Sequence, residues 1–403
     1  MSQPVVLPKP WSGADGVSVL AFSDYFSAAE GGGAERVAYQ IYRRWAESGV
    51  AVTVAVADSD ADVWGEEETG VRVWPLPAVN LTRVLHIQAS VAVGTRRLIA
   101  RLRDQGPPHV IHANSLQFQT SVIAARVATR LRIPLVLTAH IGGLGAMTSP
   151  LREMAQIHEL TLGRWLLWRT HRIVAVSHPV ASHLERYPQA RGKVVVVPNG
   201  VDHAVFRPAP RSDWAVGPVK ILYVGRLIRN KGPDQLLEAL ARLDRRALPA
   251  FTVTFVGDGP LRRRLEELAQ RHHLSEVCRF VGTQPNVADR MREADILVRP
   301  SQTEGMPLAV LEAMASGLAI IASDVPGNWE ALGGGQAGLR YPAGNVSLLA
   351  ERLHSLISDP RLRHRLGRVA HDRSLLFTWD RTAHETLEVL RAAADIPRVR
   401  ERA

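Results

Sequence analysis

Short apolar runs alternate with amphipathic segments along the whole chain. Runs such as Val17–Phe22 and Ile296–Val298 are only a few residues long, which favours strands of a parallel sheet that is buried on both faces. Between such runs lie segments like Ala34–Ser48, whose apolar residues recur three or four positions apart, the spacing of one face of a helix. This alternation of strands and helices predicts an α/β fold.

The same rhythm occurs in both halves of the chain. A length of 403 residues exceeds one ordinary core and fits two domains of about 200 residues each. We therefore predict two doubly wound α/β domains that face a central cleft. The expected boundaries are a disordered leader over 1–16, a first domain over 17–206, a linker over 207–218, a second domain over 219–376, a last helix over 377–396 and a tail over 397–403.

The composition is that of a globular protein, with 46% apolar residues and a mean hydropathy near zero. There is no uncharged apolar run of about 18 residues, so we expect no membrane-spanning helix. The first residues, MSQPVVLPKPWSG, lack the basic start and the apolar core of a secretory signal. Cys278 is the only cysteine, which excludes an internal disulfide. These features predict a cytoplasmic protein.

The net charge of +10 and the pI of about 10.4 indicate an acidic partner, such as nucleic acid, anionic lipid or a phosphorylated small molecule. No zinc-finger spacing or aromatic RNA-binding signature accompanies this charge, so we expect no nucleic-acid partner. Arg83–Arg103 is predicted to be a helix whose basic C-terminal half lies on the surface or contacts an anionic membrane. Met154–Arg172, rich in Leu and Trp with basic ends, is predicted to be a helix that lies partly in the core and partly on the surface, rather than a lipid anchor.

Candidate chemistry gathers in the stretch Ala294–Glu330, which has the pattern of a strand, a loop, a helix and a second strand. Ligands of parallel sheets bind where strand ends meet helix starts. Glu304 lies in the loop and Glu312 on the helix, with seven residues between them. Pro307 is expected at the first helical position. The free amides between Gly305 and Leu308 face the same space, which suits an anionic or hydroxyl-rich ligand.

Two further loops follow predicted strands. Gly31–Gly33 precedes the first helix and permits close approach of a phosphate or a sugar, but it lacks the G-x-G-x-x-G spacing of a nicotinamide-binding site. Gly225 and Arg226 follow the strand Lys220–Val224, and Lys231 comes five residues after Arg226. Fixed cations at such a strand end can stabilise a departing diphosphate.

Polar residues also mark two strand ends in the first half. His112 and Asn114 lie at the end of one strand, and His140 directly follows the strand Leu135–Thr138. These are crevice positions in a doubly wound sheet. The pair His109 and His112 has no cysteine or carboxylate beside it that would complete a metal site.

Several of these motifs together resemble one family. The E-x7-E spacing of Glu304 and Glu312, the GGGAERV loop, PNGVD at 198–202, GR-x4-KG at 225–232, GDGP at 257–260 and FTW at 377–379 cover most of the chain. This set resembles the retaining nucleotide-sugar glycosyltransferases of the GT-B fold, family 4 (glycosyl transferases group 1). The resemblance implies two Rossmann-like domains, with a C-terminal helix that crosses back to the first.

The resemblance also implies roles for individual residues. Glu312 would bind the ribose and Glu304 a hydroxyl of the donor sugar, with the amides of Gly305 and Met306 nearby. The loop reads EGMP where many relatives have EGFG or EGFP, so Met306 is a departure that bears on the fit around the sugar ring. The implied catalytic residues are His140, Arg226, Lys231 and Glu304; the donor-binding residues are Gly32, Gly33, Gly225, Arg226, Lys231, Glu304, Gly305, Met306, Pro307, Leu308 and Glu312; the acceptor-side residues are Gly31, Glu35, His112 and Asn114.

The expected reaction uses neither a covalent protein nucleophile nor a metal or cofactor. The departing phosphate would itself deprotonate the acceptor. A D-x-D motif, the diphosphate-metal ligand of other transferases, matches Asp58 and Asp60, but the acids continue to Glu68 as in a solvated loop.

We expect a UDP-sugar donor, with a GDP-sugar next, and a hydroxyl of a glycan, a lipid-linked sugar or a small metabolite as acceptor. The alternatives are a metal-dependent transferase, a sugar phosphorylase, a nucleotide-sugar epimerase, and a non-enzymatic protein that binds membrane or nucleic acid. Peripheral contact with the inner face of an anionic membrane is left open.

Overall fold

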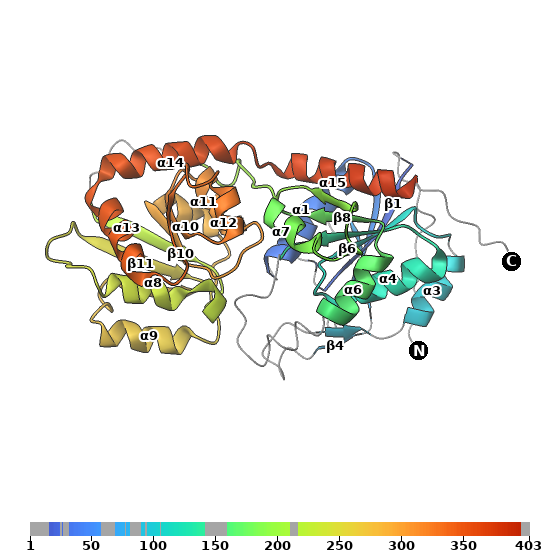
Figure 1. The fold of residues 1–403 in the computed structure, drawn as a ribbon, viewed down its shortest axis with the longest axis horizontal. Helices are drawn as coiled ribbons and strands as arrows, with labels where there is room; N and C mark the ends of the chain where they lie inside the picture. Colours follow the sequence, from blue (N-terminus) through green and yellow to red (C-terminus); the bar gives the residue numbers. More distant parts are fainter. Residues whose placement is uncertain are drawn as a thin grey trace.

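The structure is a computed structural model. It describes residues 16–24, 26, 32–57, 69–76, 78–80, 90–92, 95–104, 106–141, 159–209 and 217–395. The predicted leader up to residue 15, Gly31, Asp58–Asp62, most of the linker and the tail lie outside these residues. Figure 1 shows two lobes side by side, each built around its own sheet.

The first lobe contains a seven-stranded sheet in the order β3-β2-β1-β6-β7-β8-β9. All of its neighbouring strands run parallel. The central strands are buried along their whole length, as the short apolar runs predicted. The strands are β1 (Ser18–Ser23), β2 (Ala51–Val56), β3 (Arg72–Pro75), β6 (Val110–Asn114), β7 (Leu135–Ala139), β8 (Arg172–Ala175) and β9 (Val194–Val196).

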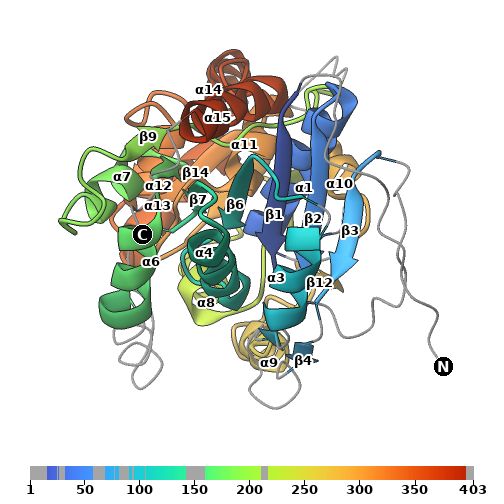
Figure 2. The same ribbon diagram turned by 90° about the vertical axis from the view of Figure 1, so that its right-hand side faces the viewer.

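Helices cover both faces of this sheet (Figure 2). One face packs on α1, whose Val37, Ile41 and Trp45 are buried as the helical spacing predicted. The opposite face packs on α4. The remaining elements of the lobe are a two-stranded antiparallel ribbon, short helices and one π-helical turn. The bounds are α1 (Gly33–Glu47), β4 (Ala78–Asn80), β5 (Ser90–Ala92), α3 (Thr95–Asp104), α4 (Gln119–Leu131), η1 (Glu159–Gly163), α6 (Arg164–Arg169) and α7 (His178–Leu184).

The second lobe contains a six-stranded parallel sheet in the order β12-β11-β10-β13-β14-β15. Its strands are β10 (Val219–Val224), β11 (Phe251–Val256), β12 (Cys278–Gly282), β13 (Ile296–Arg299), β14 (Ala319–Ser323) and β15 (Leu339–Tyr341). Its helices are η2 (Arg229–Lys231), α8 (Pro233–Leu240), α9 (Arg262–Arg271), α10 (Val287–Glu293), α11 (Leu308–Ala315), α12 (Pro326–Ala331), α13 (Val346–Ser358) and α14 (Pro360–Ser374). Cys278 is buried at the start of β12.

The last helix, α15 (Trp379–Ala394), lies on the first lobe against α1, β6, β7 and β8. Figure 1 shows α14 and α15 in sequence across the top of both lobes. Gly200 of the PNGVD motif lies under this crossing, because an added Cβ would overlap the backbone of Trp379. Val201 also pairs with Thr378 in a parallel bridge. The predicted crossing of the C-terminal helix is therefore confirmed.

Two predicted helices are wrong in part. Of Arg83–Arg103, residues 90–92 form a strand and the helix begins only at Thr95, because the valines that alternate before Gly94 favour extended backbone. Of Met154–Arg172, the described part is the π-helical turn and then α6, which ends where Thr170 becomes extended. Among the described residues, no helix has the length and apolar character to cross a membrane.

Candidate functional site

The loops that follow β10 and β13 meet at one edge of the second sheet. The two strands are parallel neighbours, so their carboxyl ends lie side by side at a crevice position. Gly225 and Arg226 follow β10, Lys231 ends the short helix η2, and Glu304 follows β13. The residues that the sequence singled out in two separate motifs are thus brought together.

Glu304 forms the centre of this cluster. Lys231 Nζ donates to both carboxylate oxygens, at 2.9 and 3.0 Å. Burial alone would raise the pKa of Glu304, but the charges of Arg299 and Lys231 outweigh it and hold the pKa at about 2. Since this lies below the ordinary value of 4.5, the ion pairs stabilise the fold above about pH 4.5 and are lost as the pH falls toward 2. At neutral pH Glu304 is a fixed, fully charged acceptor.

Arg299, which the sequence analysis missed, is the second partner of Glu304. It is the last residue of β13 and is buried. Its Nε donates to Glu304 Oε1 at 2.9 Å, and its Nη2 bonds the same oxygen. Its Nη1 donates to the carbonyl of Val224 at 2.7 Å. One signal in the sequence could have found it: an arginine that closes an otherwise apolar strand needs a buried partner.

Arg226 is exposed at the rim of the cluster. Burial raises the pKa of Glu35 in the first lobe, and the charge of Arg226 acts to lower it. The same charge acts to lower the pKa of Lys231 in the second lobe. Burial is the main cause that lowers the pKa of Lys231, while Glu304 opposes the shift. Arg226 therefore lies near both walls of the cleft with its guanidinium open to solvent.

Glycines allow the loops of this site to pack backbone against backbone. An added Cβ at Gly225, whose φ is +156°, would lie 2.7 Å from Arg299 Nη1. Gly257, of the GDGP turn, has a φ of +127° and leaves no room for a Cβ beside the carbonyl of Gly225. The turn thus supports the loop that carries Arg226, which is a structural role.

Glu312, on α11, is almost fully buried and faces the first lobe. Its Oε1 accepts an ion-pair hydrogen bond from Arg36 on α1. Its Oε2 is buried and has no hydrogen-bond partner within the described part of the chain. A buried carboxylate oxygen with an unused lone pair is an acceptor prepared for a hydroxyl donor.

His140 is placed at the first-lobe side of the cleft by Asn114. Because Asn114 Nδ2 donates to the carbonyl of Ala34 at 3.0 Å, its Oδ1 is left to accept from His140 Nε2 at 2.8 Å. His140 Nε2 therefore carries the proton and Nδ1 the lone pair. Burial lowers the pKa of His140 to about 4, so the ring is neutral at pH 7.

The loops that carry His140 and Glu304 touch across the cleft. A Cβ added at Gly305 would overlap the carbonyl oxygen of His140 and lie 3.4 Å from Val176. Asn199 of the PNGVD motif donates to the carbonyl of Met306 at 2.9 Å. The predicted residues on either side of the cleft are thus joined directly.

The start of α11 also contacts the first lobe. Pro307 is the residue before the first helical position, which shifts the predicted helix start by one residue. Leu308 packs in the apolar cluster of α1 and α15 and reaches the position of a Cβ at Gly33. Gly32 lies directly before α1, and its amide donates to Glu35 Oε2 at 2.9 Å. Glu35 therefore caps its own helix.

His112 does not lie in the cleft with the other predicted residues. Its Nδ1 is hydrogen-bonded to Tyr42 and its Nε2 to Thr138, both at 2.8 Å, and the side chain is buried beside Trp45. Burial lowers the pKa of His112 to about 3. The expectation of an acceptor-side His112 is corrected: it is a neutral core residue between the sheet and α1.

Asp24 is a further buried acid that the sequence analysis missed. It follows β1 and accepts from Thr120 Oγ1 at 2.7 Å, at the start of α4. Burial raises the pKa of its carboxyl to about 6. No group of three or more metal-binding side chains occurs within the described ranges.

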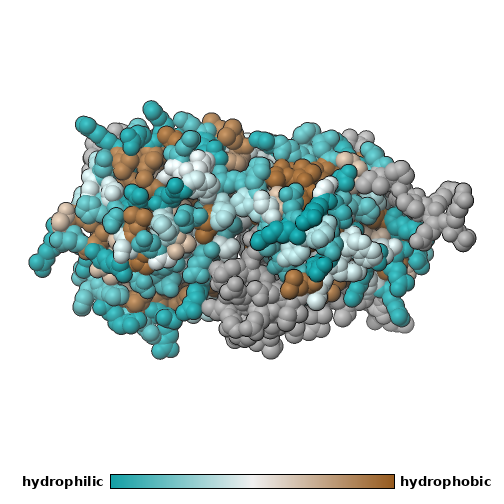
Figure 3. Space-filling model, viewed as in Figure 1, coloured by the Kyte–Doolittle hydropathy of each residue, from teal (hydrophilic) through white to brown (hydrophobic). Residues whose placement is uncertain are grey.

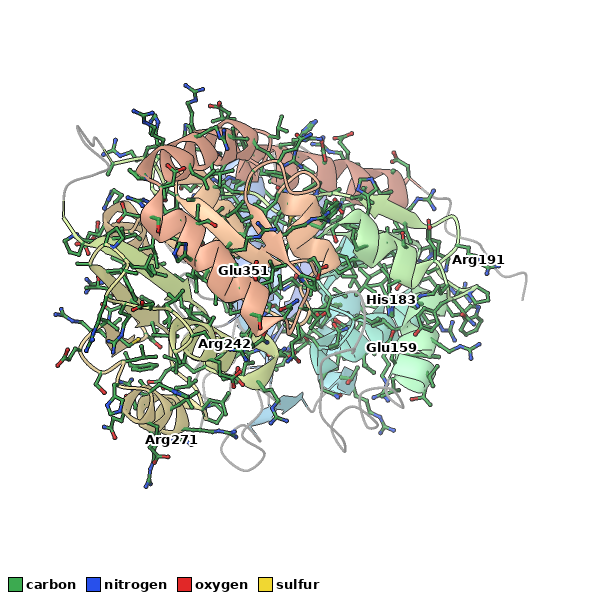
Figure 4. All side chains as sticks on the ribbon, turned by 60° about the vertical axis from the view of Figure 1, so that its left-hand side comes forward. Glu159, His183, Arg191, Arg242, Arg271 and Glu351 are labelled. Carbon is green, nitrogen blue, oxygen red and sulfur yellow. The ribbon has the colours of Figure 1, made fainter. Side chains whose placement is uncertain are left out.

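A cavity of about 440 Å³ opens beside Glu304 and is walled on the first-lobe side by α7. Ser182 and His183 line it from α7, and Thr303 lines it from the second lobe. Figure 4 shows His183 next to Glu159, whose Oε1 accepts from His183 Nε2 at 2.6 Å. The cavity connects the charged cluster with solvent between the two lobes.

Comparisons with known proteins agree with this arrangement. A family model described as Glycosyltransferase Family 4 matches residues 31–205, and one described as Glycosyl transferases group 1 matches residues 209–373. A D-inositol 3-phosphate glycosyltransferase of Nocardiopsis dassonvillei is 30% identical over 402 residues, which cover 92% of this chain and 91% of the relative. A glycogen synthase of Mycobacterium tuberculosis is 30% identical over 290 residues, 71% of this chain and 69% of the relative.

Among solved structures, the HepE protein of Anabaena in complex with UDP-glucose superposes with a TM-score of 0.76 at 20% identity. The match covers 93% of this chain and 99% of that chain. It extends over both lobes and therefore includes their relative placement.

Proposed function

Because the chain belongs to the glycosyl transferases group 1 of glycosyltransferase family 4, we propose that it transfers a sugar with retention from a nucleotide-sugar donor, without a metal. Its two facing parallel sheets have the GT-B architecture, and it is a glycosyltransferase. The first lobe, 17–206, would hold the acceptor and the second, 219–376, the donor.

One observation carries the proposal: two cations and two buried carboxylates converge on one crevice. Arg226 and Lys231 would neutralise the charge that develops on a leaving diphosphate. Glu312 offers the unpaired Oε2 to a ribose hydroxyl. Glu304, which lines the cavity beside this cluster, would accept a hydroxyl of the donor sugar.

The titration of Glu304 and His140 supports retention without either of them as a general base. A general base works best with a pKa near the working pH, whereas the pKa of Glu304 is about 2 and that of His140 about 4. The departing phosphate would then take the acceptor proton on the same face of the sugar. In a metal-free reaction, Arg226 and Lys231 would supply the positive charge that a divalent ion supplies in other transferases.

For the donor we propose a UDP-sugar, with a GDP-sugar next, because the similar HepE structure contains UDP-glucose. For the acceptor we propose a hydroxyl of a glycan, a lipid-linked sugar or a small metabolite. The two relatives described above are named for different acceptors, a glycogen and an inositol phosphate, so membership of the family leaves this choice open.

Calorimetric titration with UDP, GDP, ADP and dTDP, each in EDTA, tests the donor site. We expect one nucleotide to bind, and Glu312→Ala to weaken it about 10- to 100-fold, the range for a lost hydrogen bond to a charged group. Glu351→Ala is the matched control, because Glu351 is an exposed carboxylate on α13, which also belongs to the second lobe (Figure 4). Failure of all four nucleotides to bind would refute the transferase proposal in this form.

The rival reactions are separated by product analysis. A phosphorylase would consume a glycoside with orthophosphate alone, and an epimerase would convert a nucleotide sugar without any acceptor. We expect neither reaction, because the matching family model and the full-length relative are named as glycosyltransferases. Turnover under either condition, monitored by ³¹P NMR, would favour the rival over the transferase.

We also propose peripheral contact with an anionic membrane through η1 and α6. Leu160 is 55% exposed and Trp168 is 59% exposed, and hydrophobic areas interrupt the hydrophilic surface of this lobe in Figure 3. Arg164 is exposed, and Arg169 stacks over Trp168 with its Cζ 4.3 Å from the ring centroid. Apolar side chains flanked by cations favour anionic lipid surfaces.

Vesicle flotation tests this contact. We expect binding to phosphatidylcholine vesicles only when they contain phosphatidylserine, and release of the protein at high salt. Trp168→Ser should weaken the binding severalfold, whereas Leu375→Ser should not, although Leu375 is also 55% exposed, because it lies after α14 in the other lobe. Equal binding to neutral vesicles, or no effect of Trp168→Ser, would exclude this surface.

A further inference from the structure

We propose that Arg299 is a positioning residue: it holds the Glu304 carboxylate in place while Lys231 leaves that carboxylate for the donor diphosphate. The inference rests on the proposed function and adds a residue to which neither the family motifs nor the sequence analysis assigned a role.

Arg299 is fixed by contacts on all sides. Its guanidinium bonds Glu304 through Nε and Nη2 and the carbonyl of Val224 through Nη1. The side chain is buried at the end of β13, and Gly225 closes over it, because an added Cβ there would lie 2.7 Å from Nη1. A planar guanidinium with three such bonds has one orientation available. Arg299 therefore cannot follow a ligand.

Lys231 differs from Arg299 in this respect. Both hydrogen bonds that the structure gives its Nζ go to Glu304, and its ammonium ends a flexible four-carbon stem. Without a donor, the two cations share one buried carboxylate, so the cluster has a surplus positive charge. A diphosphate that enters the crevice would attract the mobile ammonium and leave the fixed guanidinium on Glu304.

The contacts also divide the work between the two carboxylate oxygens. Arg299 bonds Oε1 alone, whereas Lys231 bonds Oε1 at 2.9 Å and Oε2 at 3.0 Å. When Lys231 turns to the diphosphate, Oε1 keeps its bonds to Arg299 and Oε2 has a free lone pair. Glu304 itself lines the cavity beside α7. Because Arg299 occupies Oε1, Oε2 is the oxygen that would accept a hydroxyl of the donor sugar.

Without Arg299, Glu304 would lose its charge compensation in the donor complex. The charges of Arg299 on β13 and Lys231 on η2 act on Glu304. Tyr223, a buried phenol that donates to the carbonyl of Arg226, interacts with Glu304 electrostatically, and His183 and Arg186 line the same cavity from the side of α7. A buried carboxylate deprived of its cation takes up a proton more readily. The sugar hydroxyl would then lose a charged acceptor.

The test compares the wild type with Arg299→Leu and Arg299→Lys in calorimetry, using the nucleoside diphosphate and the corresponding sugar nucleotide. We expect Arg299→Leu to bind the bare nucleotide within about threefold of the wild type. It should bind the sugar nucleotide about 10- to 100-fold more weakly, the effect of a lost charged hydrogen bond to the sugar. Arg299→Lys should restore part of the difference, and Arg279→Leu, an exposed arginine on β12, should change neither affinity.

A pH profile of kcat, which reports the groups that titrate in the donor complex, separates positioning from a merely structural role. In the wild type we expect no titration of Glu304 between about pH 5 and pH 9, whereas in Arg299→Leu an acidic limb should appear within this range. If Arg299→Leu does not fold, Arg299→Lys and Arg299→Gln provide the same comparison. An unchanged affinity ratio and pH profile in folded variants would overturn the role of Arg299 alone. Lack of nucleotide binding by the wild type would overturn the proposed function, and this inference with it.

Discussion

Replacement of Lys231 by alanine is expected to lower kcat/KM about 100- to 1,000-fold, the range measured when one preorganised transition-state donor is removed. Lys231 would lose two contributions. Its ammonium would no longer neutralise the departing diphosphate, and the buried Glu304 would keep only Arg299 as its cation. Because the first contribution grows as the glycosidic bond breaks, the loss should appear mainly in kcat.

Arg229→Ala is the control for Lys231→Ala, because Arg229 is an exposed cation on the same short helix. It removes one positive charge from η2 without touching Glu304. Steady-state kinetics should show less than about a threefold effect for this control, since exposed charges are screened by salt. An equal loss in both variants would mean that η2 acts only through its overall charge.

Gly305→Ala is expected to separate the two lobes at the site and to reduce activity about 100-fold or more, as misplacement of reacting groups by about 1 Å does. An added Cβ would overlap the carbonyl of His140, whereas its contact with Val176 at 3.4 Å would be an ordinary one. The overlapped group is backbone, so it cannot give way as a flexible side chain could. The loops that carry His140 and Glu304 would therefore move apart.

Gly344→Ala provides the matched control for this substitution. Gly344 has a φ of +87° and open space around a Cβ, so alanine there brings backbone strain of about 1–2 kcal/mol but no clash. Thermal unfolding and kinetics of both variants separate the two effects. We expect Gly344→Ala to lower the unfolding temperature with little effect on kcat. Gly305→Ala should have its main effect on kcat. Full activity of Gly305→Ala would show that the lobes need not close this tightly.

The contact between these loops also bears on side reactions. Hydrolysis of the donor competes with transfer, so an enzyme of this kind benefits from a site that excludes water. In the structure, Arg36 bonds Glu312 and Asn199 bonds the carbonyl of Met306, each from the first lobe to the second. These bonds join the lobes on the side of the cleft where the donor would lie.

Much of the fold was predictable from the sequence because its signals are local. Strands such as β10, β11 and β13 are short, mostly apolar runs. This pattern is typical of strands in a sheet that is buried on both faces. Helices such as α4, α7, α9 and α12 were not predicted, because they are short, rich in charge or rich in small residues. Their positions are set by the sheet on which they pack, which no local pattern encodes.

The site was predictable to the level of its motifs but not of its contacts. Glu304, Glu312, Arg226 and Lys231 were identified, but the partner that fixes Glu304 was not. Arg299 follows the strand residues ILV and takes part in no spacing rule, because its function depends on the neighbouring strand end. Which side chains meet across a crevice depends on how the folded backbone brings the strand ends together, and a local sequence pattern does not show this.

His112 shows the opposite error. Along β6, residues 110, 112 and 114 point to one face of the sheet, and this face is covered by α1. Only the strand-end residue, Asn114, reaches the edge at which His140 lies. A histidine two residues inside a buried strand is therefore expected in the core, and Tyr42 and Thr138 satisfy its ring nitrogens there.

The most direct test of the central claim is ¹H NMR of donor turnover in EDTA, with water as the acceptor and an α-linked sugar nucleotide of the base selected by calorimetry. We predict that the α-anomer of the free sugar appears first, before mutarotation, at a rate that EDTA does not change. Initial release of the β-anomer, or loss of turnover in EDTA, would contradict retaining, metal-independent transfer.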